Sequence, residues 1–370
     1  MSKRFVSVFI LSFILVISHF GSDVAIGQTL LGASRRVANH NHAPRPSRVR
    51  RAPVPVTRTP PARSVVSPGD GDRAAFDLPP TLREAVAWQA ALDRVGFSPG
   101  IIDGLIGPKT RTSLAAFQSA AGIVANGRFD REARTALGID SVPATYVYTL
   151  TSEDAASLGD CPTGWIEKSR ASWLGFDSLT AVAANRGHCS RKLLAMLNPG
   201  KTLDALIVGD RIILPNVVRA NPDQHASEIE IDFGTRTLHL LDRDGRRIGL
   251  LYCSIARERW QRPSGPCRVD NITHDPKYLF KPESWPEVRG VHRRLVIPPG
   301  PRNPVGLCWI GLSIKGYGIH GTPRPELIGK TGSHGCFRLA NWDILRLANR
   351  VKPGTPVYFI DSSVTVARGG

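Results

Sequence analysis

The spacing of apolar residues changes at Glu228, and this change constrains the fold more than any other feature. From Leu82 to Leu137, apolar residues recur at spacings of three and four, which is typical of amphipathic helices. From Glu228 onwards they alternate with polar residues, as at Ile229 and Ile231, which is typical of half-buried strands. A chain of 370 residues is also long enough for two or three domains. The sequence therefore predicts a multidomain protein in which a helical part precedes a β-rich part.

The β-rich part is expected to contain several short strands and one helix. A hairpin is predicted between Ile229 and Tyr252, because apolar runs flank a turn at Asp244-Gly245. Further strands are predicted at 295–297, 307–312 and 356–360, and a helix is predicted at 341–351. The last helix therefore lies between two strands near the end of the chain.

Reactive side chains concentrate in two motifs of the β-rich part, Ile319-His320-Gly321-Thr322 and Ser333-His334-Gly335-Cys336-Phe337-Arg338. A thiol is a weak nucleophile until it loses its proton, so a reactive cysteine needs an imidazole that accepts the proton and remains beside it. Cys336 is the predicted nucleophile. His320 ends a predicted strand, and the loop that follows can bring it to the cysteine, so it is the predicted general base. His334, only two residues from Cys336, is assigned a supporting role.

The remaining polar groups of the second motif are candidates for holding the substrate. Gly335 lets the backbone approach a reacting carbonyl closely, and the amides around Gly335 and Cys336 are candidate oxyanion donors. Arg338 is always charged and suits a peptide carboxylate or a structural acid. Ser333, Gly335 and Arg338 therefore form the predicted oxyanion and substrate-binding group.

In their order and spacing, these motifs resemble the catalytic domain of the YkuD family of L,D-transpeptidases, from about Ile229 to Ile360. The resemblance implies a β-sandwich with a short helix, expected at residues 226–362 and followed by a tail at 363–370. It implies that Cys336 attacks the peptide bond before a terminal D-alanine in a peptidoglycan stem tetrapeptide. The resulting thioester is then resolved by an amine acceptor. In the family, a small residue follows the base histidine and its carbonyl orients the imidazole, a position that Gly321 matches. Neither a metal nor a cofactor is expected.

The helical part contains a short internal sequence repeat. Residues 103–114 and 126–137 match at a Gly-containing turn, at an Arg-Thr pair and at a leucine. Glycine with aspartate or asparagine suits such turns and caps the helices that follow them. The segment resembles a three-helix peptidoglycan-binding domain, which we expect at residues 79–140.

A second small module is expected between the helical and β-rich parts. Residues 176–216 read as helix, helix and short strand, and they end in Val208-Gly209-Asp210 and Leu214-Pro215. This pattern resembles LysM, a small α/β fold that binds glycans containing N-acetylglucosamine, although no opening strand is recognisable. We assign residues 141–220 to a LysM-like module with its connector. The alternative is a helical spacer between domains.

The first 27 residues have the pattern of a signal peptide. Lys3 and Arg4 precede an apolar run from Phe5 to Ile17, and small residues follow at Ala25 and Gly27. The run is shorter than the roughly 20 residues that a membrane-spanning helix needs. We predict cleavage near Gly27 and export to the periplasm or cell envelope; an uncleaved anchor is the alternative.

Residues 28–78 are rich in arginine and proline and contribute much of the formal net charge of +17. Such a segment cannot bury enough apolar surface to offset its ordering entropy, so it is predicted to be a disordered linker. Export excludes nucleic acid as its partner. The linker is either a spacer kept soluble by charge or an arm for an anionic wall or membrane surface.

The chain has six cysteines. Their spacing suggests disulfides between Cys161 and Cys189 and between Cys253 and Cys267, because an exported chain enters an oxidising compartment. Cys336 must stay reduced to react. Cys308, inside an apolar run, is then expected to be a buried free thiol.

Four other functions use the same residues. Water in place of an amine at the thioester would give an L,D-carboxypeptidase. An inactive C-terminal domain would leave a wall-binding scaffold, and a cysteine endopeptidase would open wall bridges. Finally, His320, His334 and Cys336 are residue types that bind zinc, although no fourth ligand is evident.

Overall fold

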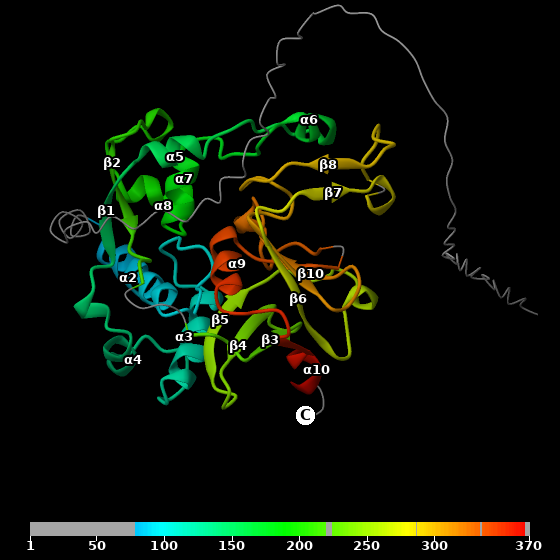
Figure 1. Ribbon diagram of the computed structural model, residues 1–370. Coiled ribbons are helices and arrows are strands. Elements are labelled where there is room, and N and C mark those ends of the chain that lie inside the picture. Colours follow the sequence, from blue (N-terminus) through cyan, green and yellow to red (C-terminus); the bar gives the residue numbers. More distant parts are fainter. Residues whose placement is uncertain (1–77, 220–223, 286, 334, 367–370) are drawn as a thin grey trace, which may run out of the picture. The chain divides into compact units, whose positions relative to one another are not determined.

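The structure, a computed structural model, describes residues 78–219, 224–285, 287–333 and 335–366 (Figure 1). The predicted signal peptide, all but the last residue of the predicted basic linker, and His334 lie outside the described residues. In the ranges that are described, no helix combines the length and apolar character needed to cross a membrane. These ranges hold a helical part, a middle part and a β-rich part, in that order along the chain.

The helical part consists of α2 (Pro80–Arg94), α3 (Pro108–Ala120) and α4 (Arg131–Ala136). The two turns that echo each other in the sequence are held in the same way. The amide oxygen of Gln89 accepts hydrogen bonds from the backbone N–H groups of Asp103 (3.2 Å) and Gly104 (2.9 Å). Gln118 accepts the equivalent bonds from the turn at 126–127 (3.1 and 2.8 Å). The sequence repeat is therefore also a structural repeat. In each copy, a buried glutamine of the helix accepts hydrogen bonds from the turn that follows.

A two-stranded antiparallel sheet of β1 (Thr145–Thr149) and β2 (Arg211–Pro215) organises the middle part. The helices between these strands are α5 (Ser152–Ala156), α6 (Trp165–Arg170), α7 (Leu179–Arg186) and α8 (Arg191–Leu197). The hydroxyls of Ser178 and Ser190 cap α7 and α8. The elements α7, α8 and β2 occur where the sequence predicts helix, helix and strand. The strand β1 is additional.

The β-rich part has an eight-stranded sheet in the order β11-β10-β9-β6-β12-β3-β4-β5, and a separate hairpin of β7 and β8. Its strands are β3 (Glu228–Asp232), β4 (Thr237–Leu241), β5 (Arg247–Tyr252), β6 (Cys267–His274), β7 (Tyr278–Phe280), β8 (Leu295–Ile297), β9 (Cys308–Leu312), β10 (Gly318–His320), β11 (Phe337–Arg338) and β12 (Pro356–Ile360). Short 3-10 turns lie in connections at Ile139–Ser141, Leu203–Ala205, Arg259–Gln261, Pro282–Ser284 and Pro325–Leu327.

The eight-stranded sheet has two halves that share one core. The strand β6 pairs with β9 along most of its length but meets β12 only at Cys267 and Arg268. Buried side chains from both halves, such as Leu238 and Ile310, pack together with those of α9 (Asn341–Ala348). The sheet is therefore arranged around one core that α9 helps to form, and α10 (Ser362–Val366) follows the last strand. α9 ends at Ala348, three residues before the predicted 351.

Residues 159–175 leave the middle part and return to it; we call them the 159–175 loop. Its base is closed by a hydrogen bond from the N–H of Gly159 to the carbonyl of Phe176 (3.1 Å). The helix α6 lies within this loop, next to the β7–β8 hairpin (Figure 1). There the ring of Trp165 stacks on Phe280 with 4.2 Å between centroids. The loop therefore joins the middle part to the β-rich part, and it separates β1 from the helices that pack with it.

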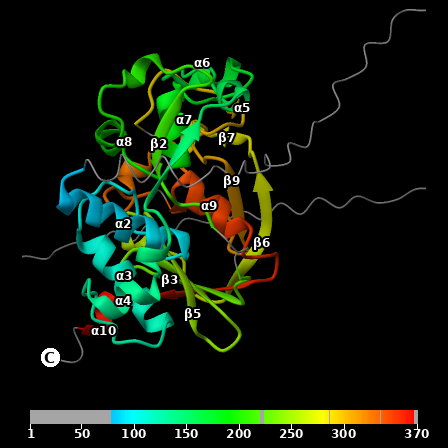
Figure 2. The same ribbon diagram turned by 90° about the vertical axis from the view of Figure 1, so that its left-hand side faces the viewer.

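The helical and β-rich parts share a buried interface. Apolar side chains of the helical part, including Trp88 and Leu114, form one cluster with Leu250 and Trp342 of the β-rich part. The N–H of Leu250 also donates to the carbonyl of Gly96 (3.1 Å). Figure 2 shows α3 alongside β5, in agreement with Figure 1. These two parts are therefore packed against each other rather than joined only by the chain.

A buried ion-pair network lies in the same region. Asp93, with no exposed surface, accepts hydrogen bonds from the guanidinium of Arg346 (2.7 Å) and from Nδ1 of His188 (3.1 Å). Burial alone would raise the pKa of Asp93, but Arg346 and His188 lower it below its usual value. Asp343 accepts from the hydroxyl of Ser98 (3.1 Å), and burial raises its pKa to about 6. This network connects α2, the middle part and α9.

Candidate active site

Two short parallel strands bring the sequence motifs together. β10 and β11 pair with His320 opposite Arg338, and continuing this register places Gly318 opposite Cys336. Opposed residues of paired strands face the same side, as do residues two apart on one strand. The side chains of Cys336, Arg338 and His320 therefore face one side of the sheet.

The imidazole of His320 is oriented by the residue after it. Nδ1 donates a hydrogen bond to the backbone carbonyl of Gly321 over 2.7 Å, so Nε2 carries the lone pair. The ring is 6% exposed and stacks on Trp309 at 5.7 Å between centroids. Burial lowers the pKa of His320 to about 4, although the bond to Gly321 opposes the shift. His320 is therefore neutral near pH 7, and Nε2 is able to accept a proton.

The thiol of Cys336 is half-buried beside β10. Burial raises its pKa, while a backbone hydrogen bond from Gly318 and the charge of Arg338 act in the opposite direction. The carbonyl of Gly316 lies 3.8 Å from Sγ. The resting pair is therefore a thiol and a neutral imidazole, and the proton must move when the sulfur attacks.

Ser333 shapes the loop around Cys336. Its hydroxyl donates to the carbonyl of Cys336 over 2.6 Å and accepts from the N–H of Gly335 over 3.2 Å. The amide of Gly335 therefore bonds to Ser333 rather than presenting its N–H to a substrate. Gly335 has φ +145°, a conformation that residues with side chains rarely adopt. His334, between them, is outside the described residues.

The guanidinium of Arg338 is hydrogen-bonded to the backbone of the loop that precedes Cys336. One terminal nitrogen donates to the carbonyls of Thr331 (3.0 Å) and Gly332 (2.6 Å). Among the residues that the structure describes, Nε of Arg338 has no partner although it is buried. Burial lowers the pKa of this guanidinium, and Cys336 acts to raise it. Arg338 thus fixes the loop and places a positive charge near the thiol.

A cavity of about 590 Å³ opens over Cys336, His320, Ser333 and Arg338; we call it the catalytic cavity. The β7–β8 hairpin and the segment after β7 contribute further lining residues: Tyr278, Leu279, Lys281, Ser284 and Trp285. Trp309 and Arg324 also line it. The sequence motifs do not identify these residues, because they have no fixed spacing from the cysteine. Their only signal in the sequence is the aromatic content of residues 278–285.

Two protein families match parts of this chain. Residues 226–359 match the family described as "L,D-transpeptidase catalytic domain", and residues 83–137 match the "Putative peptidoglycan binding domain". The "Putative L,D-transpeptidase YkuD" of Bacillus licheniformis is 32% identical over 181 residues, which cover 49% of this chain and 92% of that protein. The chain belongs to the L,D-transpeptidase family.

Two further relatives of this L,D-transpeptidase differ in how much they share with it. The "Probable L,D-transpeptidase YbiS" of Escherichia coli K12 is 48% identical over 165 residues, which cover 43% of this chain and 50% of that protein. The crystal structure of the L,D-transpeptidase from Xylanimonas cellulosilytica is 16% identical and covers 81% of this chain and 100% of that one. Its TM-score is 0.32.

The position of Gly321 in this L,D-transpeptidase leaves no room for a side chain. A Cβ atom there would lie 2.4 Å from Oδ1 of Asn341 and 3.0 Å from a methyl of Ile344. Asn341 is itself fixed, because its side chain bonds the backbone of Leu307 (3.2 Å) and Pro301 (2.9 Å). The carbonyl that orients His320 is therefore held by close packing against α9.

The predicted disulfides of this L,D-transpeptidase are wrong. All six cysteines are free, and Cys189 and Cys253 are buried in separate cores, whereas Cys161 and Cys267 are partly exposed. The prediction that Cys308 is a buried free thiol is confirmed. Within the described residues, no group of three or more His, Cys, Asp or Glu is placed to hold a metal ion.

The acid limb of the pH–rate profile tests the state of His320. The pKa of this imidazole is lowered to about 4, so the base stays neutral down to that pH. We expect the rate of Cys336 acylation to be constant from neutrality to about pH 5 and to fall as the pH approaches 4. The acylation rate is measured across this pH range by quenching the reaction at set times and recording intact-mass spectra. A fall centred near pH 6.5, the usual value for histidine, would contradict the burial argument.

Proposed function

We propose that this L,D-transpeptidase acts on peptidoglycan stem peptides through a thioester on Cys336. The thiol attacks the carbonyl before the terminal D-alanine, and His320 accepts the thiol proton at Nε2 and returns it to the leaving amine. D-alanine departs, and an amine of a second chain resolves the thioester. The observation that carries the proposal is the pairing of β10 with β11, with His320 bound at Nδ1 to Gly321.

The groups around the thiol have separate roles in this proposal. The backbone of Gly318 and the charge of Arg338 favour the thiolate that forms during attack, since both act to lower the pKa of Cys336. Ser333 and Arg338 are positioning residues, because they bond the loop backbone. With the N–H of Gly335 bound to Ser333, the N–H of Cys336 is the remaining oxyanion donor proposed from the motif. A supporting role for His334 stays a prediction.

We further propose that the parts before the catalytic domain hold the enzyme on the wall. The proposed limits are 79–140 for the peptidoglycan-binding domain, 141–220 for the LysM-like module with its connector, and 226–362 for the catalytic domain. The LysM-like assignment is supported by the β1–β2 sheet with α7 and α8, because β1 supplies the opening strand that the sequence pattern lacked. Attachment to the polymer raises the local concentration of stem peptides without altering the chemistry.

The location of the protein belongs to the same proposal. A substrate in the cell wall requires an enzyme in the periplasm or cell envelope, which is consistent with a signal peptide at 1–27. The basic linker at 28–78 would then face anionic wall polymers or membrane lipids. No cofactor enters the proposed reaction.

Mass spectrometry with a disaccharide tetrapeptide tests the function. We expect an adduct on Cys336 equal to the donor minus D-alanine, followed by cross-linked dimers. The Cys336→Ala variant should give neither product. Adduct formation that persists in this variant would contradict the proposed nucleophile.

The same measurement separates the alternatives. Tripeptide without dimers would indicate an L,D-carboxypeptidase, because water would then resolve the thioester. Release of fragments from intact sacculi would indicate an endopeptidase. Binding to sacculi without any adduct would indicate a scaffold.

A further inference from the structure

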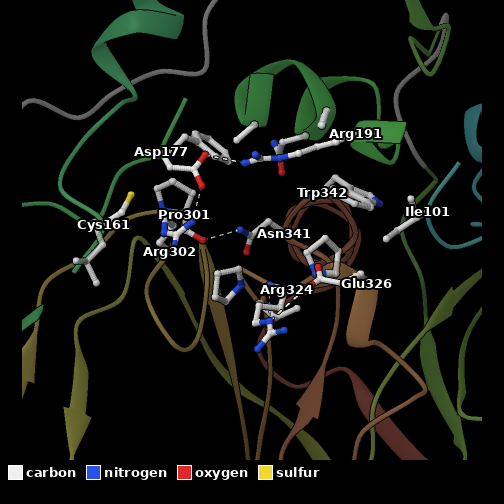
Figure 3. Close-up of a pocket in the computed structure, with 18 of the residues that line it drawn as sticks. Ile101, Cys161, Asp177, Arg191, Pro301, Arg302, Arg324, Glu326, Asn341 and Trp342 are labelled. Carbon is white, nitrogen blue, oxygen red and sulfur yellow. Dashed lines mark hydrogen bonds and ion pairs between the residues drawn. The ribbon is translucent and has the colours of Figure 1, made fainter. Parts of the chain in front are cut away.

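A second cavity, of about 750 Å³, lies beside the catalytic cavity. Figure 3 shows residues that line it. We call it the upper cavity. It shares Thr322, Pro323 and Arg324 with the catalytic cavity, so this segment after His320 borders both cavities. Most of its other lining residues come from residues 161–191 of the middle part, from α9, and from Ile101, Pro301 and Arg302. No sequence motif points to it, because its walls are far apart along the chain.

The lining of the upper cavity carries excess positive charge. Asp177 bonds two guanidinium groups, those of Arg191 (2.7 Å) and Arg302 (3.0 Å), as Figure 3 shows. One carboxylate neutralises only one of these cations. Arg324 is paired with Glu326, but Lys168 lines the cavity with its Nζ over a tryptophan ring. The lining therefore has four cations against two carboxylates.

The cations lie close enough to act on one another, and two of them remain open to solvent. Burial lowers the pKa of Lys168, and the charge of Arg302 lowers it further, which places these two cations within each other's field. Arg302 and Arg191 are 38% and 55% exposed in their side chains. Each keeps guanidinium N–H groups that Asp177 does not occupy. A bound carboxylate would relieve the repulsion and accept these hydrogen bonds.

The wall that carries Arg302 is fixed to the middle part by main-chain contacts. The N–H of Leu174 donates to the carbonyl of Pro299 (2.9 Å), and the N–H of Arg302 donates to the carbonyl of Leu174 (3.1 Å). Gly300, at φ +135°, permits this approach, because a Cβ there would lie 2.2 Å from the carbonyl oxygen of Leu174. The upper cavity is thus a built space and not a gap between loosely associated parts.

We propose that the upper cavity binds the acceptor, an acidic peptide whose amine enters the catalytic cavity past Thr322 and Arg324. This rests on the proposed function, in which two chains must meet at Cys336. The donor occupies the catalytic cavity through its acyl group, so the second chain needs an adjoining space. A glycan strand carries few charges and would form few ion pairs with Arg191 and Arg302. Stem peptides carry free carboxylates, which match them.

The transfer step balances without any other reactant. The lone pair of the neutral acceptor amine forms a bond to the thioester carbonyl carbon. The C–S bond breaks, and its electron pair remains on Sγ of Cys336. The surplus proton of the amine passes through His320 to that sulfur, which restores the resting thiol.

Acceptor kinetics in the full chain test the proposal. A disaccharide tetrapeptide serves as donor and a labelled tripeptide with a free amine as acceptor, since the tripeptide has no D-alanine to lose. In Arg302→Ala, Asp177 pairs with Arg191 alone, and we expect the KM for acceptor to rise about tenfold. The rate of Cys336 acylation by donor should be unchanged, which also shows that the variant is folded. Arg302→Lys should recover part of the loss.

Two controls make the test specific for charge. Arg246→Ala removes an exposed arginine in the turn between β4 and β5 that lines neither cavity, and it should leave the KM for acceptor unchanged. An acceptor with amidated carboxyl groups should bind the wild type weakly and show no further loss in Arg302→Ala. An unchanged KM in Arg302→Ala, or a parallel fall in donor acylation, would overturn the proposal. Absence of any Cys336 adduct in the wild type would instead refute the proposed function.

Discussion

Replacing His320 by glutamine is expected to slow the acylation of Cys336 by about two to four orders of magnitude at pH 7. The thiol has a raised pKa, so almost none of it is ionised at this pH without a base. Glutamine keeps the approximate size of the side chain but accepts no proton. The measurement is the time course of adduct formation with the donor peptide, followed by intact-mass spectrometry.

The pH dependence separates loss of a base from loss of structure. In His320→Gln, acylation should rise about tenfold per pH unit towards the thiol pKa, because only the ionised fraction reacts. The wild type should show no such slope above pH 5. His239→Gln is a matched control: His239 is also buried, with its pKa lowered to about 4, but it lies on β4, bonds Thr237 (2.9 Å) and does not line the catalytic cavity. Equal losses in the two variants would contradict the assignment of His320.

Replacing Asp93 by asparagine is expected to destabilise the folded chain by about 3–5 kcal/mol. The substitution removes the only carboxylate bonded to Arg346 at hydrogen-bond distance among the described residues, and both side chains are buried. Arg346 would keep only the more distant carboxylate of Asp343, at 3.7 Å, and a buried guanidinium that has lost its hydration and its closest carboxylate is costly. The midpoint of thermal unfolding at pH 7 should fall by roughly 5–10 °C.

Asp140→Asn is the control for this variant. Asp140 also pairs with an arginine, Arg134 at 2.7 Å, but its side chain is 70% exposed, so little change in the midpoint is expected. The pKa of Asp93 is lowered in the folded state, so its contribution is complete above the unfolded value of about 4 and declines as the pH falls. The difference between wild type and Asp93→Asn should therefore narrow in acid. A constant difference, or one no larger than that of Asp140→Asn, would show that Asp93 is not the charge that holds the interface.

Much of the fold was predictable because the informative patterns are local. The alternation at Ile229 and Ile231 and the turn at Asp244-Gly245 identify the hairpin from adjacent residues alone. The strand β1 was not predictable in the same way. It pairs with β2 more than sixty residues later, and the 159–175 loop interrupts the pattern that would connect it to α7. The disulfide predictions failed for a related reason, since spacing along the chain does not bring two thiols together: Cys253 and Cys267 pack in the same core and are both free.

The candidate site likewise contains some residues that the sequence predicts and others that it does not. Cys336, His320 and Gly321 belong to short motifs whose chemistry is readable from residue type and order. Tyr278 and Trp309 reach the catalytic cavity only through tertiary packing. Even within the motif, sequence reasoning assigned the amide of Gly335 to an oxyanion, and only the three-dimensional placement of the Ser333 hydroxyl shows that this amide is already bonded.

The stacking of Trp165 on Phe280 affects how this protein can be recombined with its relatives. The β7–β8 hairpin pairs with no other strand in the described part of the chain, and an isolated two-stranded hairpin is marginally stable. Its order therefore depends on an aromatic ring that is encoded more than a hundred residues earlier. A chimera that joins this catalytic domain to the upstream part of another family member would keep every motif residue and still lose one wall of its active site. We therefore expect substitutions at Trp165 and Phe280 to occur together.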